Sequence, residues 1–343
     1  MSNMPEGLKQ KMQKQGYHFV GGHSAVKTCE YTANGLRGKT LCYKYTFYGI
    51  KSWQCIQGTP AIGCDLGCTF CWRLIPEEHG YKWNELNAVE QWDEPEKIVE
   101  GMIEEQRRLL GGFNATADTE LKQRRWKEAR EPKHVALSLT GEPMFYPKMS
   151  RLLAEFHKRG ISTFLVHNGT LPEALEKLDT LPTQMYISLQ APDEEVYIKT
   201  VRPKIPGTWE RFRKALSMMR SLKTRTVLRM TLVKGLNFCN PGGYAELIRL
   251  AMPNYVEVKG FSFVGGARED QRGLSLQSIP MQDEIRGFAG KLAELTGYIV
   301  TSEHAPSHVV LLSRDEESKR NRVIDFSKIG KEYGKPETAS QSV

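Results

Sequence analysis

Short apolar runs alternate with amphipathic stretches through most of the chain. The runs are rich in β-branched and aromatic residues and cover residues 135–139, 162–166, 185–189, 226–233 and 255–261. Between them, apolar residues recur with helical spacing over 148–158, 209–222 and 244–251. Strand patterns that alternate with helix patterns in this way predict βαβ units and a parallel sheet.

A further strand is expected just before the cysteine-rich loop at residues 64–71, which brings the predicted parallel strands to six. Because eight parallel strands close a barrel, six predict an α/β fold with an open, partial (β/α)6 barrel. Ligands bind such sheets where the strands end and the loops begin. Five polar segments follow predicted strands: Thr140–Pro143, His167–Gly169, Gln190–Pro192, Lys234–Gly235 and Lys259–Gly260.

The chain divides into four expected parts. Residues 1–54 form an N-terminal extension, 55–261 the partial barrel, 262–313 a C-terminal α/β extension with a helix at 281–295 and a strand at 308–312, and 314–343 a charged, flexible tail. No apolar run has the length of a membrane span, and the first residues lack the apolar stretch of a signal peptide. We therefore expect a cytoplasmic protein, and a monomer by default.

Positive charge is concentrated near the N-terminus. The chain has a formal net charge of +8, and residues 1–60 alone contain eight Lys or Arg against two Glu. A second basic stretch, 122–133, combines cations with a tryptophan, a mixture that suits single-stranded RNA. The candidates for RNA contact are Arg124, Arg125, Trp126, Lys127 and Arg130. The simpler interpretation of this stretch is a solvated helix face.

Six of the seven cysteines fall into two groups of three. The first group is evenly spaced, with twelve residues between neighbours, and the second forms a tight C-x3-C-x2-C loop. The groups are Cys29, Cys42 and Cys55, and Cys64, Cys68 and Cys71. The seventh, Cys239, is expected to be an unligated thiol.

Three thiolates without a fourth cysteine favour an iron–sulfur cluster with one open iron. Structural zinc is usually closed by four protein ligands. A disulfide framework fits poorly, because disulfides need an oxidising compartment and these cysteines are crowded into a small part of a long chain. The sequence therefore predicts two clusters, with zinc and free thiols as the alternatives.

The C-x3-C-x2-C loop, with Phe70 before its last cysteine and a partial barrel after it, resembles the radical S-adenosylmethionine (SAM) superfamily. The resemblance implies that Cys64, Cys68 and Cys71 hold a [4Fe–4S] cluster whose open iron binds SAM. In that superfamily, an electron from the cluster cleaves SAM into methionine and a 5′-deoxyadenosyl radical, while the protein fixes geometry and excludes solvent.

The resemblance also implies SAM contacts at the ends of predicted strands. Residues 140–143 resemble the Gly-Gly-Glu segment of the superfamily, with a threonine in place of the first glycine. Arg229 interrupts an apolar strand and is a candidate partner of the SAM carboxylate, because a buried cation needs an anion. The full set of expected SAM contacts is Phe70, Thr140, Gly141, Glu142, Asn168, Ser188 and Arg229. Without the resemblance, Glu142 is interpreted as a turn residue and Asn168-Gly169 as a type I′ turn.

The chain is most similar to one family of that superfamily, the tRNA 4-demethylwyosine synthases. The similarity runs from about residue 29 to about residue 312 and includes both cysteine groups and the segments 137–143, 166–172, 186–189, 225–237, 255–260 and 302–304. It implies that 1-methylguanosine next to the anticodon of phenylalanine tRNA is condensed with pyruvate to form a tricyclic base. In the implied reaction the 5′-deoxyadenosyl radical takes hydrogen from the N1-methyl group, and the carbon radical adds to pyruvate.

The activation of pyruvate has two possible routes at this stage. An auxiliary [4Fe–4S] cluster on Cys29, Cys42 and Cys55 would chelate pyruvate through its open iron. The alternative is a Schiff base with a lysine, for which the weak candidates are Lys148, Lys234 and Lys259. An external electron donor, a flavodoxin or ferredoxin, is implied because the flavodoxin-like domain of eukaryotic members is absent, which makes the chain archaeal in type.

Two other interpretations stay open. One is another RNA-modifying radical SAM enzyme with an auxiliary cluster, such as a methylthiotransferase, although the full preceding domain and the small C-terminal β-barrel of those enzymes are not recognisable. The other is a metal-stabilised RNA-binding protein without catalysis; as a zinc protein it would be colourless, whereas a two-cluster enzyme would be brown and oxygen-sensitive. Gln190 and Val264 depart from the family pattern, and His304 and His308 are given no role.

Overall fold

The structure, a computed structural model, describes residues 4–86 and 89–331. Within these residues one ten-stranded sheet has the order β1-β2-β3-β4-β5-β6-β7-β8-β10-β9. The strands are β1 (His18–Val20), β2 (Ser24–Val26), β3 (Cys55–Thr59), β4 (His134–Leu137), β5 (Ser162–His167), β6 (Gln184–Leu189), β7 (Arg225–Met230), β8 (Tyr255–Lys259), β9 (Ile299–His304) and β10 (Val309–Ser313).

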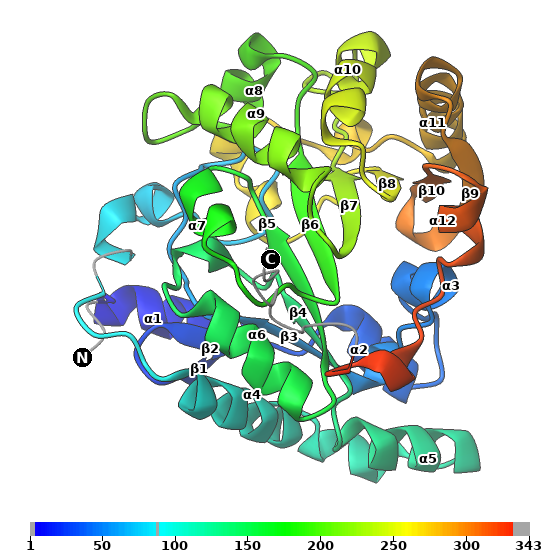
Figure 1. The fold of residues 1–343 in the computed structure, drawn as a ribbon. Helices are drawn as coiled ribbons and strands as arrows, with labels where there is room; N and C mark the ends of the chain where they lie inside the picture. Colours follow the sequence, from blue (N-terminus) through cyan, green and yellow to red (C-terminus); the bar gives the residue numbers. More distant parts are fainter. Residues whose placement is uncertain (1–3, 87–88, 332–343) are drawn as a thin grey trace, which may run out of the picture.

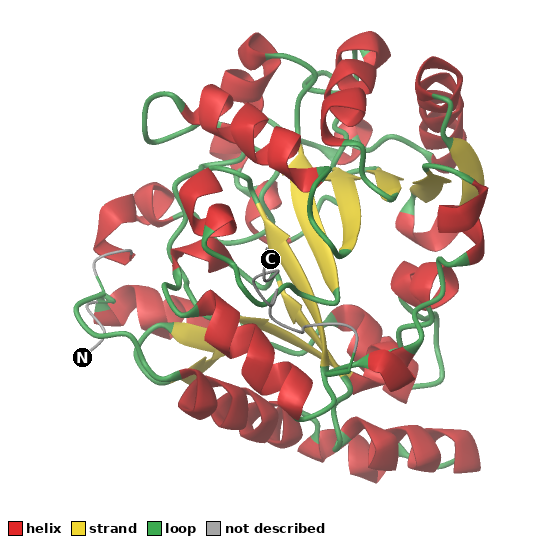
Figure 2. Ribbon diagram, in the orientation of Figure 1, coloured by secondary structure: helices red, strands yellow, loops and turns green. Residues whose placement is uncertain are grey.

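Helices connect and surround these strands (Figures 1 and 2). They are α1 (Glu6–Lys14), α2 (Glu30–Leu36), α3 (Tyr43–Tyr48), α4 (Pro95–Leu109), α5 (Glu120–Ala129), α6 (Met149–Lys158), α7 (Pro172–Glu176), α8 (Glu194–Val201), α9 (Thr208–Met219), α10 (Pro241–Ala251), α11 (Gln282–Thr296) and α12 (Glu316–Arg320). In the described residues, no helix combines the length and the apolar character that crossing a membrane requires.

Six strands, β3 to β8, pair in parallel and in sequence order. This confirms the predicted open, partial barrel. Antiparallel strands extend the sheet at both ends: β1 and β2 lie beyond β3, and β10 and β9 lie beyond β8. The predicted strands over 226–233 and 255–261 end earlier, at Met230 and Lys259. Val233 and Phe261, which follow them, belong to a separate apolar cluster.

The two faces of the parallel sheet are both apolar. Alternate residues face outward into a large core that also includes residues of α4, α6, α9, α10 and α11. The other residues face inward and form a second cluster, whose strand members include Ala136, Phe164, Tyr186, Val227 and Tyr255. Burial on both faces is typical of strands in parallel sheets.

Helix α3 fills part of the barrel interior. Its side chains Tyr43, Phe47 and Tyr48 belong to the inner cluster and are 6%, 0% and 0% exposed. The N-terminal extension therefore supplies part of the core of the barrel. The strand β9, which the sequence did not predict, is only partly buried along its length, so its polar residues conceal the usual alternation.

The segment that follows β10 packs against the end of the barrel. Ile324 is 3% exposed and belongs to the inner cluster, and Arg225 of β7 donates hydrogen bonds to the carbonyl oxygens of Asn321 and Arg322. The expectation of a loosely held tail is therefore wrong for residues 314–331, because isolated apolar side chains anchor it. The rest of that predicted tail, 332–343, lies outside the described residues.

Candidate active site

The loop Cys64–Cys71 follows β3 and is held in place by the end of α8. The backbone N–H groups of Gly67 and Thr69 donate to the carbonyl oxygens of Val201 and Thr200, both at 2.9 Å. Because both bonds join backbone to backbone, they fix the path of the loop whatever side chains it carries. The three cysteines of the loop are thereby presented at the carboxyl end of the first parallel strand.

Charged side chains clamp the outer side of this loop. Arg202 Nε donates to the carbonyl oxygen of Gly67 at 2.5 Å, and a second nitrogen of Arg202 lies 3.4 Å from Glu78. Glu78 also accepts hydrogen bonds from the buried Arg272, and Arg272 in turn donates to the carbonyl oxygen of Cys71. The buried cation of this group, Arg272, thus has both an anion and carbonyl groups as partners.

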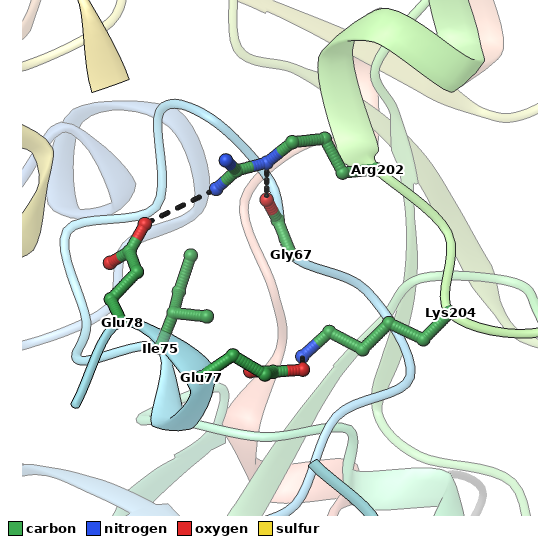
Figure 3. A pocket seen from close by; sticks show the side chains of 6 residues that line it. All are labelled: Gly67, Ile75, Glu77, Glu78, Arg202 and Lys204. Carbon is green, nitrogen blue, oxygen red and sulfur yellow. Dashed lines mark hydrogen bonds and ion pairs between the residues drawn. The ribbon is translucent and has the colours of Figure 1, made fainter. Parts of the chain in front are cut away.

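A small pocket of about 160 Å³ lies among these groups (Figure 3). Its walls are Gly67, Ile75, Glu77, Glu78, Arg202 and Lys204, and Lys204 pairs with Glu77 across it. None of the predicted SAM contacts lines this pocket. Because its charged groups already pair with one another, we interpret it as part of the support of the cysteine loop.

Glu142 joins the segment after β4 to the segment after β5. Its Oε1 accepts a hydrogen bond from the backbone N–H of Met144 at 2.9 Å, and its Oε2 accepts one from the backbone N–H of Asn168 at 2.8 Å. Burial, reinforced by the negative charge of Asp65, raises the pKa of Glu142 to about 8. A cationic group bound nearby would favour the ionised carboxylate.

Gly141 lies where the backbone of two segments meets. Its φ is +69°, and a Cβ atom on it would lie 2.3 Å from the carbonyl oxygen of Ala61. Only glycine fits, since any side chain would collide with the chain that enters the cysteine loop.

Asn168 connects Glu142 with the cysteine loop. Its Nδ2 donates to Asp65 Oδ1 at 2.8 Å and lies 3.9 Å from Cys64 Sγ. Asp65 is fully buried, and its second oxygen has no hydrogen-bond partner among the described residues. The segments after β3, β4 and β5 therefore converge on Cys64, and this convergence places Glu142 and Asn168 at the first candidate cluster site.

The other three cysteines come together where α2, α3 and β3 begin. Cys29 and Cys42 immediately precede α2 and α3, and Cys55 is the first residue of β3. Burial raises the pKa of Cys42 to about 12, and the nearby Cys29 adds to this shift. Burial likewise raises the pKa of Cys55 to about 12, with contributions from Cys29 and Cys42. The three thiols are therefore close enough to influence one another.

The donor chemistry of both groups fits iron–sulfur clusters. None of the six thiols is in a disulfide. In residues 4–86 and 89–331, no three Cys, His, Asp or Glu side chains converge as ligands of a single ion. A cubane cluster does not require such convergence, because each thiolate binds a different iron atom. Each group supplies three soft donors, as a [4Fe–4S] cluster with one open iron requires.

A buried carboxylate holds several groups together inside the barrel, next to the group of Cys42. Glu257 of β8 is 0% exposed. It accepts hydrogen bonds from Arg229 Nε of β7 at 2.7 Å, and from the hydroxyl groups of Tyr43 and Tyr48 of α3 at 2.8 and 2.9 Å. Glu257 thus ties α3 to the strands.

Two lysines lie in the same interior region. Lys44 Nζ lies over the rings of Tyr186 and Phe164, 4.8 and 5.4 Å from their centroids, and burial together with the charge of Arg229 lowers the pKa of Lys44. Burial and Arg229 also lower the pKa of Lys259 to about 8, and Lys259 Nζ donates to the carbonyl oxygen of Gly260 at 2.8 Å. Amines with lowered pKa values are suited to attack carbonyl groups.

Comparison with known proteins identifies the family to which this chain belongs. Residues 59–248 match the profile of the radical SAM superfamily, and residues 250–314 match a profile described as wyosine base formation. A SAM-dependent tRNA 4-demethylwyosine synthase of Pyrococcus abyssi is 46% identical over 319 residues, which cover 92% of this chain and 90% of that protein. The chain belongs to the tRNA 4-demethylwyosine synthase family.

Two solved structures of this family have a similar fold. One is described as TYW1 with a lysine–pyruvate adduct bound; it is 34% identical, has a TM-score of 0.81 and matches over 94% of this chain and 99% of its own. The other, an archaeal TYW1, is 32% identical with a TM-score of 0.73 and the same coverage. The matched regions include the barrel and most of both extensions.

The predicted SAM contacts do not all lie together. Gly141, Glu142 and Asn168 lie at the Cys64 loop, as the family pattern implied. Phe70 packs against the apolar cluster of Val233 and Phe261. The contacts of all seven predicted residues, Phe70, Thr140, Gly141, Glu142, Asn168, Ser188 and Arg229, with SAM itself stay predictions.

Of these residues, Arg229 is placed differently from the prediction. It lies beside Ser188 in the sheet register, but it contacts Glu257, Tyr186 and Tyr43, which are on the side of the second cysteine group. An arginine that was predicted at the SAM site is therefore held next to the other predicted cluster of this family member.

The three candidate lysines differ in position. Lys148 pairs with Glu94, and Lys234 lies 3.1 Å from Glu284, both at the surface. These two pairs do not support a catalytic role. Lys259 is the candidate that lies in the interior.

The predicted RNA contacts all lie on α5 or directly after it, but two of them face the protein. Arg125 Nη1 donates to the carbonyl oxygen of Gly35 at 2.8 Å, and the guanidinium stacks on Trp53 at 4.5 Å. Trp126 Nε1 donates to the carbonyl oxygen of Leu110 at 3.2 Å. The exposed members of the set are Arg124, Lys127 and Arg130, and contact of these residues with RNA remains a prediction.

Sequence reasoning missed Lys44 and Glu257. Lys44 was counted as part of the basic surface of the N-terminal extension, although its position two residues after Cys42 was a usable signal. Glu257 stands two residues before Lys259 in an otherwise apolar strand, the same signal that identified Arg229. A charged residue on the inner face of a predicted strand therefore calls for a partner on a neighbouring strand.

Proposed function

We propose that this protein is a radical SAM enzyme that converts 1-methylguanosine, next to the anticodon of phenylalanine tRNA, into 4-demethylwyosine with pyruvate as the donor of two carbons. Family membership over nearly the whole chain supports this proposal. The observation that carries it is a half-buried lysine, Lys44, whose Nζ lies over the inner rings of Tyr186 and Phe164, two residues after a cysteine that the family pattern assigns to the auxiliary cluster.

In the proposed enzyme, Cys64, Cys68 and Cys71 hold one [4Fe–4S] cluster. When bound, this cluster supplies the electron, received from an external flavodoxin or ferredoxin, that cleaves SAM to give a 5′-deoxyadenosyl radical. Glu142, whose pKa burial raises, would receive the methionyl ammonium group of SAM. Asn168, which reaches both Glu142 and Cys64, fixes the two segments between which SAM binds.

Cys29, Cys42 and Cys55 hold a second [4Fe–4S] cluster in this proposal. Their thiols are buried and mutually close, and burial opposes uncompensated thiolates, which a metal cluster neutralises. The cluster and the inner charged groups would together form the pyruvate site.

Lys44 is the proposed site of a Schiff base with pyruvate. A relative with 34% identity has a solved structure described as containing a lysine–pyruvate adduct, which favours the Schiff base over chelation alone. The unprotonated amine adds to the keto carbon, a C–N bond forms, and the keto oxygen leaves as water with the two amine protons. Burial and Arg229, which lower the pKa of Lys44, increase the unprotonated fraction. Lys259 is the second candidate, because it shares the interior location.

A turnover assay tests the proposed function. The reconstituted protein is incubated without oxygen with SAM, a reductant and phenylalanine tRNA that carries 1-methylguanosine, with and without pyruvate. A heavier tricyclic nucleoside that appears only with pyruvate supports the proposal. Formation of 5′-deoxyadenosine without a new nucleoside would keep the radical SAM chemistry and reject the substrate.

Reductive trapping tests the assignment of the lysine. Pyruvate labelled with carbon-13 is incubated with the reconstituted protein and cyanoborohydride, which delivers hydride to an imine carbon, and the modified peptide is identified by mass. We expect the label on Lys44, retention of labelling in Lys259→Met, and its loss in Lys44→Met. Label on Lys259 would move the role to that residue, and Lys234→Met, at the surface, serves as the control.

A further inference from the structure

The guanidinium of Arg229 is bound on one side only. Its Nε donates to Glu257 at 2.7 Å. Its Nη2 is buried and has no hydrogen-bond partner among the described residues. Arginine stays charged, and a buried donor without an acceptor destabilises the structure that holds it. The arrangement therefore leaves a cationic donor free for a group that the protein itself does not supply.

Two arginines of the same fold, Arg225 and Arg272, have an acceptor for every side-chain nitrogen, whereas Nε of Arg125 on α5 is, like Nη2 of Arg229, buried without a partner among the described residues. Arg225 lies earlier on β7, and its three nitrogens donate to Gln184 Oε1 and to the carbonyl oxygens of Asn321 and Arg322 at 3.0, 2.6 and 2.5 Å. The buried Arg272 likewise has acceptors for its nitrogens. Arg229 differs from Arg225 and Arg272 in having a nitrogen without an acceptor, and it differs from Arg125, which lies over Trp53 on α5, in its place inside the barrel.

The orientation of Arg229 is fixed from two directions. Glu257 is itself held by the hydroxyl groups of Tyr43 and Tyr48, so the carboxylate cannot turn away. The guanidinium lies over the ring of Tyr186, with Cζ 4.6 Å from the centroid. A planar guanidinium held at one edge and one face presents its remaining donors in a defined direction.

Arg229 lies in the same interior region as Lys44. Lys44 Nζ lies 4.8 Å from the centroid of the Tyr186 ring, the ring on which Arg229 stacks. Lys44, Arg229 and Lys259 share a single carboxylate, Glu257, as their buried counter-charge. Cations in excess at a buried site favour the binding of an anion.

We propose that Arg229 binds the carboxylate of the keto acid and that Glu257 is a positioning residue that aims it. In an α-keto acid the carboxylate is attached directly to the keto carbon, so a lysine that takes the keto carbon needs a carboxylate receptor nearby. Arg229 thereby selects an α-keto acid over a neutral ketone of the same size. This inference rests on the proposed function, since it requires the adduct at Lys44, and it reassigns Arg229 from SAM to pyruvate.

Reductive trapping with a charged and an uncharged ligand tests the inference. The reconstituted protein is titrated with pyruvate or with pyruvamide, its uncharged amide, in the presence of cyanoborohydride, and the modified fraction of the Lys44 peptide is measured by mass. In Arg229→Met we expect the half-saturating pyruvate concentration to rise about tenfold to a hundredfold, as the loss of a charge-assisted hydrogen bond predicts. Pyruvamide binding should change much less.

The ratio of the half-saturating concentrations of pyruvate and pyruvamide reports the contribution of the ligand carboxylate. Loss of Arg229 also raises the pKa of Lys44 and slows imine formation, but it does so for both ligands. Glu257→Gln keeps the arginine and loosens it, so its preference for pyruvate should lie between those of the wild type and Arg229→Met. Arg225→Met, which removes an arginine from the same strand, is the matched control and should keep the wild-type preference.

Removal of Arg229 alone leaves Glu257 buried without its partner, which can destabilise the protein. The double variant Arg229→Met/Glu257→Gln removes both charges and keeps the test informative if the single variant unfolds. An unchanged preference for pyruvate in a folded variant overturns the inference. A fall in SAM affinity with no effect on pyruvate would return Arg229 to SAM. A wild-type protein that forms no adduct at Lys44 rejects the Schiff base itself and, with it, this inference.

Discussion

The carboxylate of Glu142 accepts the backbone N–H of Asn168 at 2.8 Å and thereby bonds two segments that follow different strands. The other carboxylate oxygen is bound by the backbone N–H of Met144. Glu142 is therefore a structural link as well as a candidate SAM contact. The turn interpretation of this residue and the family interpretation are compatible, because a single carboxylate can serve both.

Substitution Glu142→Ala should weaken SAM binding about tenfold or more, since the SAM ammonium group would lose a charge-assisted hydrogen bond of roughly 1.5–3 kcal/mol. Equilibrium titration of SAM into the reconstituted protein measures this effect. Glu142→Gln keeps one acceptor oxygen and should be affected less. Glu176→Ala, an exposed carboxylate on α7, is the control, and an unchanged SAM affinity in Glu142→Ala would remove the residue from the site.

The two cysteine groups should be separable by mutation. Cys42→Ala should lower the iron and sulfide content by roughly half and retain pyruvate-independent formation of 5′-deoxyadenosine, because the loop that carries Cys68 is intact. Cys68→Ala should abolish 5′-deoxyadenosine. Cys239 is exposed, and Cys239→Ala should change neither quantity. Equal loss of SAM cleavage in Cys42→Ala and Cys68→Ala would contradict two independent sites.

Charge reversal on α5 should distinguish an RNA surface from a packed helix. Arg124→Glu with Lys127→Glu should weaken tRNA binding and reduce its dependence on salt, since each lost phosphate contact lowers the number of counterions released. Arg125→Glu should instead lower the thermal stability, because Arg125 stacks on Trp53 and bonds Gly35. The measurement is the tRNA binding constant over a range of salt concentrations. If the double variant has the same dependence on salt as the wild type, this surface is only a solvated helix face.

Acid stability should depend on His157. Burial lowers the pKa of His157 to about 4, whereas an unfolded histidine titrates near 6.5. Between these values the unfolded state binds more protons, so the contribution of neutral His157 is present above about pH 6.5 and is lost as the pH falls toward 4. The loss is on the order of 1 kcal/mol per pH unit.

Urea unfolding between pH 7.5 and 4.5 measures this effect. The wild type should be more stable than His157→Gln at pH 7.5, because His157 bonds Thr163 at 2.8 Å, and the difference should shrink as the pH falls. His79→Gln, at a partly exposed position, should show no such convergence. A constant difference across the range would mean that His157 does not ionise on unfolding.

The barrel was largely predictable because its strands are apolar on both faces and short, and helices separate them. The cysteine loop and the segments at Glu142 and Asn168 were predictable for a related reason, since each follows a strand. Interior charges were harder to place. Lys44 looks like any other basic residue of a positive segment, because its burial depends on how α3 packs against strands more than a hundred residues away. The same long-range packing buries Ile324 within a stretch whose composition is charged.

Local composition also misled the interpretation of α5. Arg125 and Trp126 alternate with exposed cations along the helix, and helical spacing turns them toward Trp53 and Leu110. A mixture of cations and one aromatic residue therefore describes both an RNA surface and a helix that uses its own cation and ring for packing. Only the direction of each side chain distinguishes them.

Helix α3 and the cysteine before it bring Cys42, Lys44 and three aromatic side chains into the barrel within one short segment. A shortened protein beginning at Cys55 would keep all six parallel strands and still lack the residues that fill their concave side. The segment that carries Cys42 therefore also stabilises the barrel, and the two properties would be kept or lost together. A related protein without the second group of cysteines would still have to retain this helix, or replace its tyrosines and phenylalanine with other side chains that fill the barrel.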